Sequence, residues 1–168
     1  MIKLRALEPS DLDLLYRWEN DPETWHTTMT PVHVSRARLW EYINEFDGNI
    51  DAWQQLRLMI TDTDLQDSPV GTVDLFDIDR RSGRAFVGIY IDSQYRHQGY
   101  GHQALKMLID YSRDYLNLHQ LAAIVEVDNR PSINLFTGLD FKPAGRLRSW
   151  LKIASRYRDA IILQRLFI

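Results

Sequence analysis

The sequence predicts an α+β fold in which helices cover one mixed sheet. Three observations lead to this prediction. Short apolar strands follow one another before residue 92, one strongly periodic helix is predicted over residues 100–116, and strands predominate after it. Because that helix joins two apolar strands, the order strand–helix–strand implies a central parallel pair with a right-handed crossover.

Strands are predicted where apolar or alternating runs are bounded by turn residues. Before the central helix they cover residues 2–6, 56–61, 70–76 and 85–91. After it they cover residues 121–127, 141–151 and 160–167. Gly88, inside the fourth strand, is typical of a bulge, of a close backbone approach or of a tolerated glycine.

Two helices are predicted between the first two strands, and a short one near the end of the chain. Ser10 or Asp11 caps the first helix, and Asn20-Asp21-Pro22 ends it. Ser35 caps the second, which ends at Gly48. The predicted apolar face of the second helix consists of Leu39, Trp40, Ile43 and Phe46. The short helix covers residues 132–137 and is closed by Gly138.

We expect one domain over residues 1–168, because no repeat, low-complexity segment or linker divides the chain. Cysteine is absent, which excludes disulfides, thiolate metal sites and a cysteine nucleophile. The five histidines lack the spacing of zinc ligands, so no metal is expected. No apolar run is long enough to span a membrane, and the first residues lack the apolar core of a signal peptide. We therefore expect a cytoplasmic protein without a membrane partner.

Charge is distributed unevenly along the chain. Residues 1–95 contain 9 Lys/Arg and 17 Asp/Glu, a balance of −8, whereas residues 96–168 contain 11 and 6, a balance of +5. A basic half suits a polyanionic cofactor and an acidic half a cationic acceptor, although solvated faces can also segregate in this way. No cluster of Lys/Arg with interleaved aromatics is present, so a nucleic-acid partner is not expected.

The turn that opens the central helix is the most informative segment. An apolar strand ends at Ile91, and a turn with Arg96, Gly99 and Gly101 leads into the helix. Backbone N–H groups at a helix start are unpaired and the helix dipole reinforces them, so the turn is typical of a phosphate site. The glycines let the backbone approach the ligand closely. The segment lacks the extra glycine and lysine of a P-loop and is too short for the dinucleotide fingerprint.

The spacing Arg96-x-x-Gly99-x-Gly101 resembles the Arg/Gln-x-x-Gly-x-Gly/Ala signature with which GNAT-superfamily N-acetyltransferases hold the pyrophosphate of acetyl-CoA. Residues 127–141 resemble a second family motif, which Asn129, Ser132, Leu135 and Phe141 match. The opening residues 4–12 and the tail over 145–159 are similar to one branch of the family. That branch contains the spermidine N-acetyltransferases and the ribosomal-protein alanine N-acetyltransferases.

The resemblance implies a GNAT-like mixed, mostly antiparallel sheet with a central parallel strand pair and flanking helices. It implies acetyl-CoA as co-substrate, whose pantetheine arm would pair like an added strand with Ile89, Tyr90 and Ile91. The pyrophosphate would be held by the amides of Arg96, His97, Gln98, Gly99, Tyr100 and Gly101. The thiol end would be flanked by Asn129, Ser132 and Phe136.

The chemistry of acetyl transfer makes three demands. An amine of pKa about 10 must lose a proton, the thioester oxygen must be stabilised, and the leaving thiolate needs a proton. A strand amide near Tyr90 is the candidate for the second task. Glu126, at the carboxyl end of the buried strand, is the candidate base, with a solvated carboxylate as the alternative.

In related enzymes a tyrosine protonates the thiolate, and this chain has Phe136 at that position. Water or another tyrosine would replace the missing acid; the candidates are Tyr90, Tyr100 and Tyr157. The alternatives are slow turnover and binding of acyl-CoA without catalysis.

The expected function is N-acetyl transfer from acetyl-CoA by direct attack of a primary amine. The acceptor is a polyamine such as spermidine, or a protein N-terminal or small-molecule amine; the alternative is a non-catalytic acyl-CoA-binding module. Relatives that acetylate spermidine carry acidic residues before a proline in the early loop, where this chain has Met29-Thr30-Pro31, and at the start of the Gly88 strand, where it has Phe86. This weakens the spermidine interpretation.

Other residues are candidates for the acceptor site. The carboxylates of Glu19, Asp21 and Glu23 would serve a cationic acceptor or form a solvated helix end. Tryptophans would line an acceptor pocket or pack in the core or an interface; they are Trp18, Trp25, Trp40 and Trp53. Formation of a homo-oligomer stays open.

Overall fold

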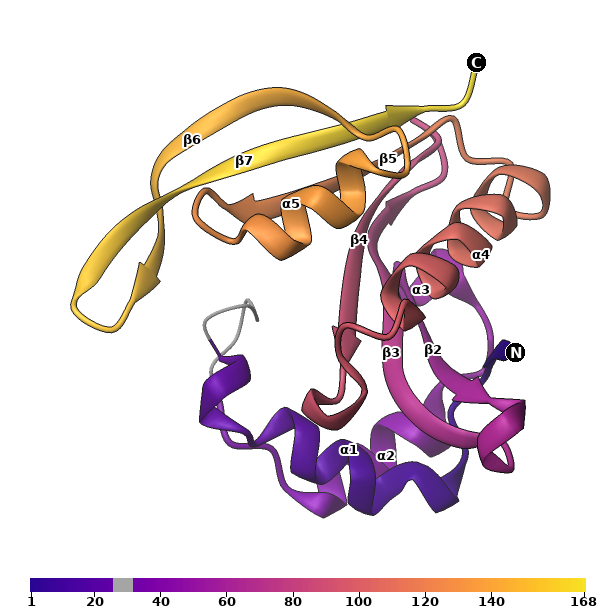
Figure 1. Cartoon of the computed structure of the whole chain (residues 1–168). Coiled ribbons are helices and arrows are strands. Elements are labelled where there is room, and N and C mark those ends of the chain that lie inside the picture. Colours follow the sequence, from indigo (N-terminus) through magenta and orange to yellow (C-terminus); the bar gives the residue numbers. More distant parts are fainter. Residues whose placement is uncertain (26–31) are drawn as a thin grey trace.

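Seven strands form one mixed sheet in the computed structural model, which describes residues 1–25 and 32–168. Their order is β1-β2-β3-β4-β5-β7-β6. The strands are β1 (Ile2–Arg5), β2 (Gln55–Asp62), β3 (Ser68–Asp79), β4 (Arg84–Ile91), β5 (Gln120–Glu126), β6 (Lys142–Ile153) and β7 (Arg156–Leu166). Neighbouring strands are antiparallel except for β4 and β5, which are parallel (Figure 1). The predicted fold class and the predicted central parallel pair are confirmed.

Five α-helices accompany the sheet within the described residues. They are α1 (Leu12–Glu19), α2 (Arg36–Glu45), α3 (Ile50–Trp53), α4 (Tyr100–Asp114) and α5 (Arg130–Thr137). Helices α1 and α2 lie at one end of the molecule, whereas α4 and α5 lie beside the central strands (Figure 1). The β6–β7 hairpin extends beyond the other elements (Figure 1).

The sheet separates two apolar cores, because successive side chains of a strand point to opposite faces. The larger core lies beneath α4, whose Leu105 and Leu108 are fully buried with Leu121 of β5. The smaller core lies beneath α1 and α2 and contains Trp18 and Met59. The strand β4 contributes to both cores and therefore lies at the centre of the molecule.

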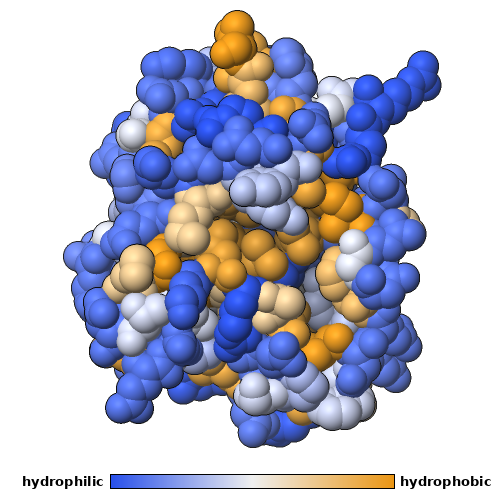
Figure 2. Space-filling view, turned by 90° about the vertical axis from the view of Figure 1, so that its right-hand side faces the viewer, coloured by the Kyte–Doolittle hydropathy of each residue, from blue (hydrophilic) through white to orange (hydrophobic). Residues whose placement is uncertain are grey.

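The larger core is incompletely covered. Partly buried apolar side chains pack against it, among them Leu4, Phe46, Ile50 and Leu58. The face turned to the right in Figure 1 has a hollow at its centre in which apolar side chains gather (Figure 2). Among the described residues, no helix has the length and apolar character needed to cross a membrane.

Several boundaries differ from the predictions. The second helix ends at Glu45, three residues before Gly48, and the short helix α3 follows it. Trp40, predicted on the apolar face, is 48 % exposed. The N-terminal helix begins with a 3-10 turn in which Glu8 and Asp11 form a capping box, so Ser10 is not the cap.

Of the three alternatives given for Gly88, the bulge is excluded. The pairing of β3 with β4 is regular from Gly71↔Ile91 to Phe76↔Phe86, and Gly88 faces Asp74 within it. The shift in register lies instead between Phe76 and Asp79. There Asp77 has a φ of 47°, the left-handed conformation that accommodates the extra residue.

Candidate active site

The parallel pair β4–β5 separates soon after it begins. The two strands share three residue pairs, Arg84↔Gln120, Ala85↔Leu121 and Phe86↔Ala122. Beyond Phe86, β4 continues to Ile91 paired with β3 alone, while β5 continues paired with β7 (Figure 1). Within residues 1–25 and 32–168, the second half of β4 therefore has a backbone edge without a strand partner, and this edge faces the gap between β4 and β5.

The residues that face this gap follow from the hydrogen-bond alternation of an antiparallel pair. The amide of Asp92 donates to the Val70 carbonyl at 2.9 Å, so Asp92, Tyr90 and Gly88 direct their backbone groups toward β3. The backbone groups of Ile89 and Ile91 consequently point into the gap. Arg96 Nε donates to the Ile91 carbonyl at 3.0 Å. An extended ligand can add to such an edge as a further strand.

The turn between β4 and α4 lies at the open end of the gap. Gly99 is the N-cap of α4 with a φ of 85°, and no side chain caps the helix. The first backbone bond of the helix runs from the Gln103 amide to the Gly99 carbonyl, so the preceding amides point outward. Residues 96–99 are exposed. The turn has the geometry of an anion site.

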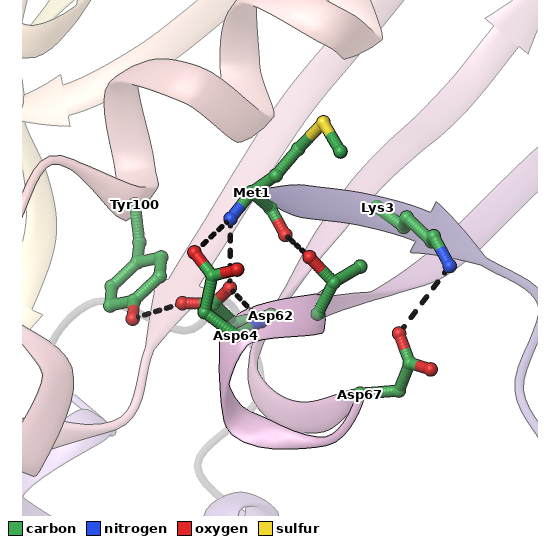
Figure 3. Close-up of polar contacts among 7 residues, drawn as sticks. Met1, Lys3, Asp62, Asp64, Asp67 and Tyr100 are labelled. Carbon is green, nitrogen blue, oxygen red and sulfur yellow. Dashed lines mark hydrogen bonds and ion pairs between the residues drawn. The ribbon is translucent and has the colours of Figure 1, made fainter.

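Tyr100, the first residue of α4, anchors this turn to the last residue of β2, two strands away from β4 in the sheet. Its hydroxyl donates to Asp62 Oδ2 at 2.6 Å, and Asp62 also accepts from the Met1 amine at 3.1 Å (Figure 3). The hydrogen bond to Asp62 raises the pKa of Tyr100 to about 12. This phenol donates to Asp62 on β2, which argues against Tyr100 as the acid for the thiolate.

Helix α5 closes the far side of the gap. Asn129 caps it, with Oδ1 accepting from the Ser132 amide at 3.3 Å. Phe136 is 2 % exposed and packs edge-on against Phe141 at 5.0 Å between ring centroids. The ring at the position of the missing tyrosine is thus part of the core.

Glu126 ends β5 and is engaged by a cation. Its Oε1 accepts from Arg158 Nε at 3.1 Å, and its Oε2 accepts from the Asp128 amide at 3.1 Å. Arg158 also contacts Asp128. Both oxygens of the Glu126 carboxylate therefore already accept a hydrogen bond. Tyr157, next to Arg158, is 64 % exposed and stands on the projecting β6–β7 hairpin.

A pocket of about 520 Å³ lies between α1 and the end of β4. Trp18 packs against Tyr90 there, with 5.3 Å between ring centroids, and donates its indole N–H to Asp92 at 2.8 Å. Arg17 and Asp21 complete the wall on the side of α1. Burial, followed by the neighbouring Asp92 carboxylate, raises the pKa of Tyr90. Of the four predicted tryptophans, Trp18 is the one that lines this pocket.

A charged cluster that the sequence analysis missed lies on the same face of the sheet. Arg57 of β2 donates to Asp74 of β3 at 2.5 Å and to Glu19 of α1 at 2.7 Å. A signal was present in the sequence, because Arg57 and Asp74 each interrupt an apolar strand. Their convergence with Glu19 requires the tertiary structure.

The remaining acceptor candidates are dispersed. Asp21 caps the 3-10 turn Pro22–Thr24 by accepting from the Glu23 amide, and Phe86 stacks on Phe76 at 5.7 Å. Met29-Thr30-Pro31 lie outside the described residues. No group of side chains suited to a metal ion occurs within residues 1–25 and 32–168.

Comparison with known proteins places this geometry in a family. Residues 2–142 match the model described as "Acetyltransferase (GNAT) domain". An uncharacterized N-acetyltransferase, p20 of Bacillus licheniformis, is 34 % identical over 161 residues, 94 % of this chain and 88 % of that protein. Spermidine N(1)-acetyltransferase of Escherichia coli K12 is 27 % identical over 160 residues, 95 % of this chain and 83 % of that protein.

Solved structures of acetyltransferases are also similar to this chain. The spermidine N-acetyltransferase of Vibrio cholerae in complex with CoA and spermine superposes with a TM-score of 0.88 at 26 % identity, covering 98 % of this chain and 95 % of that one. Another structure of the Vibrio enzyme is dodecameric, with a TM-score of 0.82 at 26 % identity, 98 % of this chain and 93 % of that one being covered.

Proposed function

Because the chain belongs to the GNAT family of acetyltransferases, we propose that it transfers acetyl from acetyl-CoA to a primary amine of a polyamine such as spermidine. It is an acetyl-CoA-dependent N-acetyltransferase by family. The observation that supports the proposal best is the gap between β4 and β5 with the uncapped start of α4 at its mouth. The polyamine is proposed from the relatives named for spermidine and from the Vibrio complex with spermine.

The proposed placement of CoA uses backbone more than side chains. The pyrophosphate lies against the amides of residues 96–101, where the start of α4 offers unpaired N–H groups and positive potential. The pantetheine arm adds to the edge of β4 at Ile89 and Ile91. The thiol end then reaches the point where β4 and β5 separate, flanked by Asn129 and Ser132 of α5.

The proposed reaction is direct attack in a ternary complex. The amine nitrogen loses a proton, its lone pair forms the C–N bond, and the thioester carbonyl becomes an oxyanion. We place the Ile89 amide, rather than that of Tyr90, as the donor to this oxyanion, because Ile89 points into the gap. The nitrogen loses its second proton as the intermediate collapses, which breaks the C–S bond and releases CoA thiolate. Water replaces the absent tyrosine as its proton donor, and Glu126 stays a prediction as the base.

Thiol release with acetyl-CoA tests the proposal. We expect spermidine to release thiol well above buffer, and more than an alanine-terminated peptide or a simple monoamine. Release with the peptide alone would contradict the polyamine acceptor.

The second candidate, a non-catalytic acyl-CoA-binding module, is favoured by the buried Phe136. Tight CoA binding without thiol release on any amine would support it against the transferase. A homo-oligomer is proposed from the dodecameric Vibrio structure, and the single domain over residues 1–168 and the cytoplasmic location stay predictions.

A further inference from the structure

The carboxylate of Asp74 is placed where an acceptor nitrogen would meet the thioester. Asp74 pairs with Gly88 across β3 and β4. Gly88 stands two residues beyond Phe86, the last residue of β4 that pairs with β5, and directly before Ile89. The position therefore coincides with the start of the gap.

The absence of a side chain at Gly88 leaves this carboxylate uncovered. A Cβ at position 88 would lie 3.5 Å from Asp74 Oδ2 and 3.6 Å from Asp74 Cβ, so a side chain there would contact that oxygen. Asp74 Oδ1 accepts from Arg57, but Oδ2 receives no hydrogen bond from the residues that the structure describes. Because no fully buried polar side-chain atom lacks a partner in the described part of the chain, Oδ2 must reach solvent.

Two carboxylates in this cluster share one guanidinium. Arg57 bridges Asp74 and Glu19, and the exposed fractions of the three side chains are 21 %, 15 % and 30 %. With all three groups ionised, the cluster carries one negative charge in excess. A partly buried excess charge interacts strongly with a cation, since water screens it weakly.

Two pockets lie along the face of β4 on which Gly88 stands. Tyr90 lines the pocket beside α1, and Phe86 lines a second pocket of about 400 Å³ at the start of the β4–β5 pair. Gly88 lies between them on this face, because side chains alternate along a strand. An elongated acceptor that ran along this face would pass Asp74.

We propose that Asp74 is the acceptor-binding residue that receives the ammonium group of a cationic amine at the gap between β4 and β5. Arg57 and Glu19 hold its carboxylate in place, and Gly88 provides the space for the nitrogen. This inference rests on the proposed function and adds to it the residue that selects a cationic acceptor.

The ionisation of the Asp74 carboxyl group also depends on the charges around it. The pKa of Asp74 is raised overall, because burial and the neighbouring Glu19 carboxylate raise it while the Arg57 guanidinium lowers it. An arriving ammonium supplies the second cation that favours the ionised form.

Calorimetric titration of spermidine into the CoA-bound protein tests the proposal without requiring turnover. Asp74→Asn retains an oxygen for Arg57 and removes the charge. We expect it to weaken spermidine binding by about tenfold to a hundredfold, the range for a hydrogen bond between charged groups. The affinity for CoA should be unchanged, because the proposed CoA contacts lie on the other edge of β4.

Glu19→Gln is the matched control. It removes the same charge from the cluster, but on the α1 side of Arg57. We expect a smaller loss than for Asp74→Asn, and less salt dependence of spermidine binding in both variants. Equal losses in the two variants would contradict direct contact with Asp74.

A second pair of variants tests the role of the space at Gly88. Gly88→Val has only ordinary contacts of 3.5–3.7 Å at its Cβ and would cover Oδ2, whereas Gly145→Val, in β6, meets nothing within 4 Å. We expect loss of spermidine binding in the first variant and none in the second. Wild-type affinity for spermidine in Asp74→Asn or in Gly88→Val would overturn the inference. Wild-type protein that did not bind CoA would overturn the proposed function instead.

Discussion

Tyr100 donates its hydroxyl to Asp62 across 2.6 Å and so joins the first residue of α4 to the last residue of β2 (Figure 3). The ring also packs edge-on against Tyr95, with 6.0 Å between centroids. Tyr95 belongs to the turn that precedes the exposed residues 96–99. The buried hydrogen bond between Tyr100 and Asp62 therefore holds the proposed phosphate turn in place, whereas residues 96–99 of the turn are exposed.

Tyr100→Phe should destabilise the fold, because it removes a buried hydrogen bond to a carboxylate. We expect a loss of about 1.5–3 kcal/mol in the free energy of unfolding, measured with urea. The control is Tyr115→Phe, because Tyr115 is 75 % exposed and its substitution should cost little. Equal stability of the two variants would show that the bond to Asp62 contributes nothing.

The same hydrogen bond predicts a pH dependence at alkaline pH. It raises the pKa of Tyr100 to about 12 in the folded protein, above the ordinary value of about 10. The stabilisation is therefore complete below about pH 10 and is lost as the pH rises through about 12. Ultraviolet titration of the folded protein should show a late-ionising component near pH 12 that is smaller by one tyrosine in Tyr100→Phe. A spectrum in which the substitution removes no late component would refute this.

Asp92 predicts a pH dependence at the acid end. Burial alone raises the pKa of Asp92. Hydrogen bonds from the Trp18 indole and the Gln94 amide, together with the charge of Arg17, lower it by more, so the pKa is lowered overall. Its stabilisation is present above the unfolded value of about 4 and is lost as the pH falls below it.

Asp92→Ala should therefore destabilise the protein by about 1–3 kcal/mol at neutral pH, since it leaves the Trp18 indole unpaired. The difference from wild type should shrink on acidification, as followed by urea unfolding at pH 7 and pH 3. Asp13→Ala is the control, because that side chain is 85 % exposed. A difference that did not change with pH would contradict the assignment.

Phe136→Tyr tests the missing acid. The hydroxyl would restore the group that related enzymes use to protonate the thiolate, and we expect the turnover number to be unchanged or raised. The ring is buried against Phe141, so the variant should also be less stable. Phe136→Leu, without a hydroxyl, should not raise turnover. A large loss of turnover in Phe136→Tyr, at temperatures where it is folded, would indicate that the ring packs for a catalytic purpose.

The central crossover was predictable because its signals are local. The turn around Gly99, the period of α4 and the apolar run of β5 each lie within one segment of sequence. The full length of β3 was not predictable from the sequence. The predicted apolar run ends at Phe76, whereas the strand continues to Asp79 through Asp77, which has a left-handed conformation.

The charged cluster could not be predicted for a different reason. Arg57 is 17 residues from Asp74 and 38 from Glu19, and only the packing of α1 on the sheet brings the three together. The same holds for Asp62 and Tyr100, which are 38 residues apart. Local patterns thus predicted the proposed cofactor turn, whereas the proposed acceptor contacts depend on tertiary structure.

Titration of CoA into wild type, Gly99→Asp and Gly48→Asp tests the central claim most directly. Both glycines have a positive φ, 85° and 82°, so the two substitutions cost similar backbone strain, and the position of Gly48 is open. We expect wild type and Gly48→Asp to bind CoA alike, and Gly99→Asp to bind more than about a hundredfold more weakly, because its carboxylate would face the phosphates. Undiminished binding by Gly99→Asp, or none by wild type, would contradict the account.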